Sequence, residues 1–150
     1  MPAHLPPTNI SIPTMLNAAQ VTQTLEDSLS EKTAYRPHKT FLLGLTGGGY
    51  VALGLVFFIT SQVGAHVLPF GVAKVLGGIV FTTGLALVVL TGAELFTAST
   101  LSLTSRASGR ITTSQLLRNW VLVYVANLCG ALTIVCLVYF SGVWYDDHGQ

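Results

Sequence analysis

The sequence predicts an all-α membrane protein with three transmembrane spans, the second of which is broken by a loop. Only 9% of its 150 residues are charged, whereas a soluble domain has about a quarter. Three apolar runs contain no Asp, Glu, Lys or Arg, namely residues 40–73, 75–93 and 119–145. Each run can supply the roughly 20 apolar residues that a helix needs to cross a bilayer. A carboxylate and a run of hydroxyls directly follow the second one.

The N-terminal 36 residues are expected to form a tail with one amphipathic helix. Residues 1–12 are rich in proline, and the helix is expected from Pro13 to about Lys32. Apolar side chains recur there near helical spacing, at Met15, Ala18, Ala19, Leu25 and Leu29. Such a helix can lie on a membrane surface or cover a face of the protein.

The spans themselves carry packing and boundary signals. Gly44 and Gly48 in the first span, about 40–62, form a small-xxx-small pair that permits close helix contact. The second span, about 71–93, follows a short loop. The third, about 119–145, has Trp120, Trp144 and Tyr145 at its ends, where interfacial aromatic residues are enriched. Thr112 and Gln115 have the spacing of a capping box and predict a helix start near Thr112.

The basic residues predict a cytosolic N-terminus. With three crossings, six of the seven Lys and Arg residues would lie on the cytosolic side, namely Lys32, Arg36, Lys39, Arg106, Arg110 and Arg118. The exception is Lys74, near the start of the second span. This distribution follows the positive-inside rule.

The stretch after the second span is too polar for a helix that faces lipid. Residues 97–104 read TASTLSLT, with five hydroxyls in eight residues. Backbone that leaves a helix at membrane depth must be buried in protein or line a wet cavity, and broken helices mark the binding sites of many transporters. Glu94 lies where the break begins. Its carboxylate either accepts hydrogen bonds from the following loop and supports the break, or titrates or binds substrate. The supporting role is favoured, and more strongly so if the substrate is an anion, because an anion pathway would not accommodate a bare carboxylate.

Other classes of protein lack support in the sequence. Four scattered histidines and two cysteines in the third apolar run give no metal-binding cluster, and no Ser, His and acid can be placed together as a catalytic triad. Gly47-Gly48-Gly49 lies within an apolar span and lacks the Lys and Ser or Thr of a phosphate-binding loop. No basic stripe suggests nucleic acid. We therefore expect neither an enzyme nor a cofactor.

Two longer stretches carry a family resemblance. LTGAELFTAST, followed by ASGRITTSQLLRNWVLVYVANLCGAL, resembles the formate/nitrite transporter family. HKTFLLGLTGGGYVALGLVFFIT and LPFGVAKVLGGIVFTTGLALVV are similar to its first span and the start of its second. Within the family the PFGVAKVLGG and ASGRIT stretches are most similar to formate channels, and the resemblance covers residues 12 to 145.

The resemblance implies a homopentamer in which each protomer is an aquaporin-like bundle of six spans with its own pore. The six spans form two inverted repeats of three, so this chain would be half of a protomer. Residues 1–36 would be the cytosolic tail. Residues 37–150 would be the first transmembrane repeat, with spans at 40–62, at 71–93 with a broken continuation at 97–118, and at 119–145.

The function implied is a channel for formate and related small monovalent anions in the bacterial inner membrane. Two alternatives remain open: a nitrite or hydrosulfide channel of the same family, and a three-span membrane adaptor that does not conduct. The bilayer, the anion and further copies of the chain would be the partners.

Site residues follow from the resemblance by position. Phe81, Leu85 and Phe96 are similar to pore-constriction residues, and Thr97 would hydrogen-bond the anion or a pore water. Residues 97–108 would form a loop that gates the cytosolic entrance, beginning with Thr97, Ala98, Ser99 and Thr100. The family's central pore histidine belongs to the second repeat and has no counterpart here. We therefore expect Gln150 to lie in the loop between repeats; the alternative is a natural or engineered half-chain that pairs with another half. This half by itself is expected to show poor or no selective transport.

Overall fold

The computed structural model describes residues 17–142, which are helical apart from short connections and contain no strand. The expectations for Pro13, Met15, Trp144 and Tyr145 lie outside the described residues. The elements are α1 (Ala18–Thr33), α2 (Pro37–Gln62), the 3-10 helix η1 (Ala65–Val67), α3 (Phe70–Thr91), α4 (Phe96–Ser99), α5 (Ser102–Ala107) and α6 (Thr113–Ser141). Helices α2, α3 and α6 are long and apolar enough to cross a membrane. The prediction of an all-α chain with three spans is confirmed.

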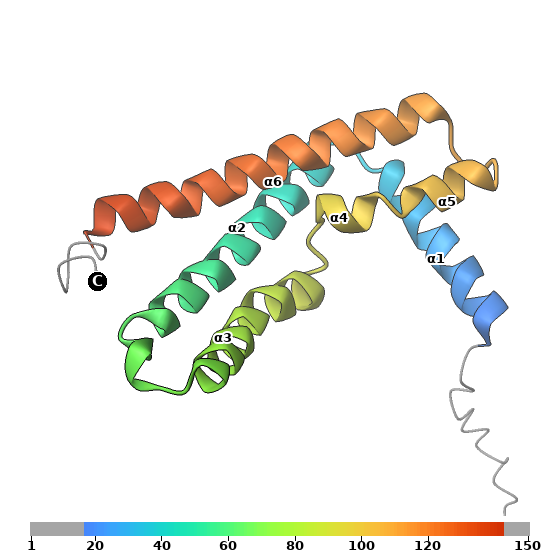
Figure 1. Cartoon of the computed structure of the whole chain (residues 1–150). Coiled ribbons are helices and arrows are strands. Elements are labelled where there is room, and N and C mark those ends of the chain that lie inside the picture. The colour runs from blue at the N-terminus through green and yellow to red at the C-terminus, as the bar shows by residue number, and fades with distance from the viewer. Residues whose placement is uncertain (1–16, 143–150) are drawn as a thin grey trace, which may run out of the picture.

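Helix α2 is the centre of the arrangement. It forms an antiparallel hairpin with α3 through η1, and α6 packs along its other side (Figure 1). The short helices α4 and α5 follow the end of α3 and lead back to the start of α6, where α1 packs on α5 (Figure 1). The chain therefore leaves the α2–α3 hairpin at one end, and the helix break lies beside α6.

Local signals explain where the long helices begin and end. Pro37 occupies the first turn of α2, where its missing N–H costs nothing. Helix α3 ends at Gly92, whose left-handed φ of 66° suits a glycine. The predicted capping box is confirmed, because the side chain of Thr112 accepts from the N–H of Gln115 and that of Gln115 accepts from the N–H of Thr112. Helix α6 thus begins before the apolar run at 119.

The long helices meet through glycine. A Cβ added at Gly44 would lie 2.7 Å from the Cβ of Ala126, and one at Gly48 would overlap the backbone of Asn127. Gly54 and Gly84 face each other across the contact between α2 and α3. The close packing predicted for Gly44 and Gly48 is confirmed at the contact of α2 with α6. Glycine also permits close packing at the contact of α2 with α3.

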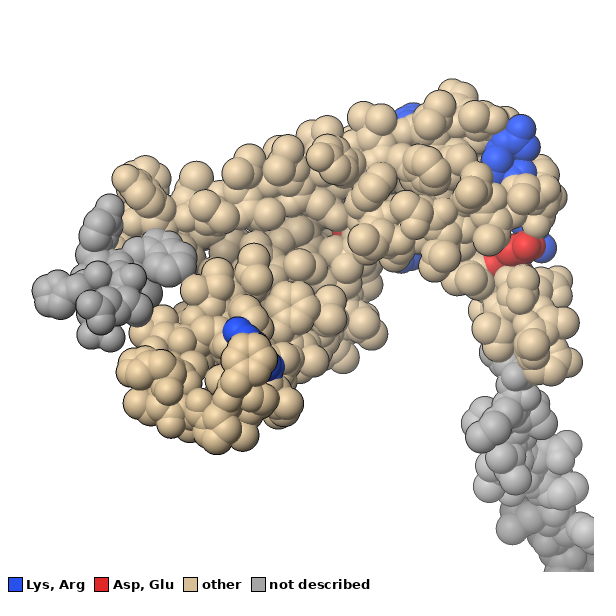
Figure 2. Space-filling model, viewed as in Figure 1, with Lys and Arg blue, Asp and Glu red and all other residues tan. Residues whose placement is uncertain are grey.

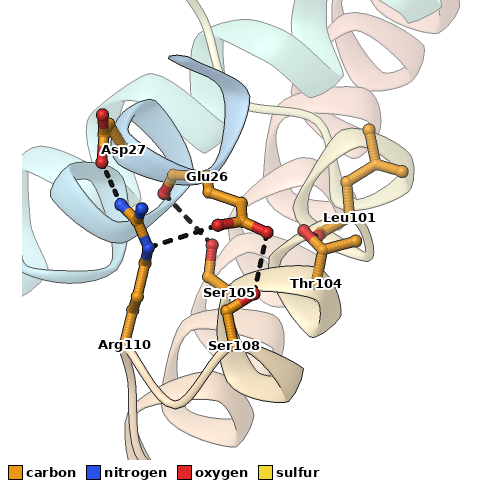
Figure 3. A network of polar contacts seen from close by, with 7 residues as sticks. All are labelled: Glu26, Asp27, Leu101, Thr104, Ser105, Ser108 and Arg110. Carbon is orange, nitrogen blue, oxygen red and sulfur yellow. Dashed lines mark hydrogen bonds and ion pairs between the residues drawn. The ribbon is translucent and has the colours of Figure 1, made fainter. Parts of the chain in front are cut away.

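Helix α1 packs on α5 through its C-terminal half, whereas residues 18–25 are exposed. Arg110 forms ion pairs with Asp27 and, at 3.2 Å, with Glu26 (Figure 3). The hydroxyl of Ser105 donates to the backbone oxygen of Glu26 at 3.2 Å, and that of Ser108 donates to the Glu26 carboxylate at 2.8 Å. These contacts attach α1 to α5 and favour the second of the two placements open for this helix.

We expect Gly48→Val to destabilise the protein strongly, because the added side chain would overlap the backbone of Asn127. Overpacking of this kind costs about 1–3 kcal/mol, or more where the backbone must move. The measurement is the Tm of the purified protein in detergent. Gly71→Val is the matched control, because nothing lies within 4 Å of a Cβ at Gly71. An equal Tm for both variants would contradict the role of glycine at this contact.

Candidate functional site

The break after α3 is short, and the hydroxyl-rich segment beyond it is helical. Residues 92–95 leave the helix, and α4 and α5 then take up most of residues 96–107. The expectation of a continuous loop over residues 97–108 is therefore wrong. The hydroxyls bond within these short helices: Thr100 donates to the backbone oxygen of Thr97 at 2.6 Å, and Thr104 to that of Leu101 at 2.8 Å. Each of these hydroxyls satisfies its own donor within the segment, so a helix rich in hydroxyls can lie among apolar surroundings.

Asn127 of α6 holds the break in place. Its amide nitrogen donates to the backbone oxygens of Gly44 at 2.8 Å and Glu94 at 2.9 Å, and its side-chain oxygen accepts from the N–H of Phe96 at 2.9 Å. The N–H of Glu94 also donates to the backbone oxygen of Leu43 at 3.0 Å. One amide side chain thus joins α2, the break and α6. The sequence analysis missed Asn127, although an amide within an apolar span was a usable signal.

Aromatic residues fix α4 against α6. The indole N–H of Trp120 donates to the backbone oxygen of Ser99 at 2.9 Å and to the hydroxyl of Ser102 at 3.2 Å. The ring of Phe96 packs edge-to-face with Trp120 and Tyr124, with centroid distances of 6.3 and 5.4 Å. Trp120 was expected only as an interfacial residue, yet its polar atom also satisfies the end of α4.

A groove of about 560 Å³ runs along α2, the break and α6. It brings together three of the predicted site residues, Leu85, Phe96 and Thr97. Its other lining residues are almost all apolar: Gly48, Val51, Ala52, Leu55, Leu95, Tyr124, Asn127, Leu128, Ala131 and Val135. A concave, mostly apolar surface with few polar groups is typical of a small-molecule site.

The remaining predicted residues lie elsewhere. Phe81 is one turn before Leu85 on α3 and does not line the groove. Ala98 and Ser99 line a separate small cavity together with Glu94, and Thr100 lines neither space. Within the predicted gating segment, Thr97 therefore faces the groove, whereas Ala98 and Ser99 face the small cavity beside Glu94.

Thr97 differs from the other hydroxyl residues of this segment. Between residues 97 and 108, all of which the structure describes, Ser99, Thr100, Ser102, Thr104, Ser105 and Ser108 each donate a hydrogen bond within the chain. The Thr97 hydroxyl alone in that range makes none, and Thr97 is exposed in the groove. It is thus free to bond a ligand or water.

Glu94 is buried, with 3% of its surface exposed. Its two carboxylate oxygens accept no hydrogen bond within the described part of the chain. The bonds that fasten the break at this residue come from its backbone N–H and backbone oxygen instead. The expectation that the carboxylate accepts hydrogen bonds from the following loop is therefore wrong, and the backbone of Glu94 makes the contacts in its place.

The fold and the groove define a helical membrane protein of the aquaporin-like class, with a broken second span. A family model for formate/nitrite transporters matches residues 19–150. The chain is 41% identical over 135 residues to the formate channel FocA of Haemophilus influenzae, covering 90% of this chain and 48% of that protein. It is 43% identical over 136 residues to the formate channel FocA of Escherichia coli (strain K12), covering 91% and 48%.

A solved structure described as a pentameric formate channel with formate bound is also similar. It superposes with a TM-score of 0.71 at 44% identity, covering 76% of this chain and 45% of that one. The chain therefore belongs to the formate/nitrite transporter family. Its relatives are channels and transporters rather than enzymes. The chain spans about half the length of the curated relatives it matches.

Asn127→Leu is expected to destabilise the helix break. The substitution would leave the backbone oxygen of Glu94 and the N–H of Phe96 without their partner, and would remove the second hydrogen bond of the Gly44 oxygen, which keeps its bond within α2. Each unsatisfied buried group costs about 1–3 kcal/mol. The Tm in detergent should fall well below that of the unmodified protein.

Thr133→Val is the matched control on the same helix. Its hydroxyl is exposed and donates only to the backbone oxygen of Cys129, one turn back. We expect little change in its Tm. A similar small change for Asn127→Leu would show that the break does not depend on this amide.

Proposed function

We propose that this chain is the first half of a channel protomer that passes formate and related small monovalent anions across the bacterial inner membrane. The support is its membership of the formate/nitrite transporter family and its identity of 41–43% to formate channels over most of its length. The pentameric description of a similar structure supports a pentamer here. Residues 1–36 would form the cytosolic tail and residues 37–150 the first transmembrane repeat.

Charge distribution supports a cytosolic N-terminus. Figure 2 shows acidic and basic atoms gathered where α1, α5 and the start of α6 meet, while the long faces of the spans are largely uncharged. Arg110, Glu26 and Asp27 belong to this end. Lys74, the one basic residue of the opposite end, bonds to Gln62 at 3.0 Å. The excess of positive charge at the first end agrees with the positive-inside rule.

The groove would be one wall of the pore. In this proposal Leu85 and Phe96 narrow the passage by their bulk, and Phe81, one turn from Leu85, extends the constriction along α3. Thr97 offers the hydroxyl that bonds the anion or a pore water. The free hydroxyl of Thr97 inside an apolar groove is the observation that carries the proposal, because an anion needs a hydrogen-bond donor where the walls are apolar.

Thr97→Val is expected to slow formate flux while the assembly remains intact. Valine keeps the shape of threonine and removes only the donor. A lost hydrogen bond of about 1.4 kcal/mol corresponds to a change of about tenfold. The measurement is uptake of labelled formate into proteoliposomes that contain the complete protomer with this half in it, with its oligomeric state checked by native mass.

Thr104→Val is the matched control, because its hydroxyl already bonds to Leu101 and lies outside the groove. It should leave the flux unchanged. An unaltered flux in Thr97→Val would contradict a direct role for that hydroxyl. Absence of any formate flux through the complete protomer that contains this half would overturn the proposed function, and competition by nitrite or hydrosulfide would show how widely the pore accepts small anions.

A further inference from the structure

A small cavity lies between α1, the helix break and α6. It has a volume of about 30 Å³. Five polar side chains line it, and the hydroxyls of Ser99 and Ser102 already donate to backbone oxygens. The other three come from three different elements: Lys32 of α1, Glu94 of the break and Asn119 of α6. The remaining lining residues are Leu29, Leu95 and Ala98. We refer to this space as the Glu94 cavity.

The three polar groups lack direct partners within the described part of the chain. Both carboxylate oxygens of Glu94 are fully buried and accept no hydrogen bond. Asn119 is 6% exposed, and neither its amide nor the ammonium of Lys32 hydrogen-bonds another described residue. A cation, an anion and an amide thus converge without direct hydrogen bonds between them.

Such a convergence is costly unless something bridges it. A buried carboxylate that gives up water without gaining hydrogen bonds loses several kcal/mol. Buried polar groups that make no direct bond are typically satisfied by ordered water. A water needs at least about 10–15 Å³ and two to four polar partners. The Glu94 cavity satisfies both conditions for one or two molecules.

We propose that the Glu94 cavity binds one or two ordered water molecules, which bridge the Glu94 carboxylate to the ammonium of Lys32 and the amide of Asn119. The bridge joins α1 and α6 to Glu94, two residues before the start of α4, and so helps to position Phe96 and Thr97. The bridge is separate from the contact between Asn127 and Glu94, because Asn127 bonds the backbone oxygen of Glu94 and not its carboxylate. It does not depend on which anion the groove accepts.

Asn119→Leu tests the bridge directly. Leucine has nearly the same size and cannot bond water. In a dry cavity this change would be neutral or stabilising, because the amide makes no direct bond to lose. With bridging water we expect amide hydrogen exchange in residues 18–33 to become about tenfold faster, as α1 opens more often. Exchange is measured by mass spectrometry on the purified assembly.

The cycle of Asn119→Leu, Glu94→Gln and the double variant tests whether the two residues share the water. A shared water makes the two effects non-additive. Additive effects, or unchanged exchange in Asn119→Leu, would overturn the proposal. Lys32→Met should also speed exchange, whereas the control Lys74→Met should not, because Lys74 bonds Gln62 far from α1.

A structure of the unmodified assembly that resolves ordered water gives an answer independent of any variant. We expect density within hydrogen-bond distance of both the Glu94 carboxylate and the Asn119 amide. A direct contact between Lys32 and Glu94, or a side chain from elsewhere that fills the cavity, would overturn the proposal.

Discussion

The close approach of α2 to both of its neighbours is the constraint on which the rest of the structure depends. Gly47 and Gly48 leave room for the backbone of Glu94 and Asn127, where a larger side chain would overlap. Because the backbones are so close, the carbonyls of Leu43 and Gly44 come within reach of the N–H of Glu94 and the amide of Asn127. The hydrogen bonds that hold the break exist only because glycine occupies this face of α2.

The hydroxyl side chains of residues 97–108 are of two kinds: most donate a hydrogen bond within the chain, and that of Thr97 is free to bond a ligand or water. Most of them bond to carbonyls of the same short helices, or to Glu26 of α1, and so satisfy backbone that has left the long helix. This makes the polar segment compatible with membrane depth. Thr97 is left over, and it is the residue that reaches the apolar groove beside Leu85 and Phe96. The residues that stabilise this segment by hydrogen bonds are therefore different from Thr97, which has the proposed transport role.

Helix α1 is attached at two places of different physical character. The Arg110 contacts with Glu26 and Asp27 lie near the surface (Figure 3), where ion pairs contribute little and are screened by salt. The Glu94 cavity is buried, so salt screens it much less. The second attachment reaches the break itself, and through it the segment that carries Thr97.

The sequence by itself determined the three spans, the position of the break, the capping box at Thr112 and the glycine contacts, because hydropathy and local spacing decide these features. The family resemblance read from it also predicted Leu85, Phe96 and Thr97 as pore residues, and the structure places these three along one groove. Only the tertiary structure showed that Asn127 fastens the break, that residues 96–107 are largely helical, and that Ala98 and Ser99 face away from the groove. These features depend on contacts between residues that are far apart in the sequence, such as Gly44 and Asn127. Local sequence patterns do not predict such contacts.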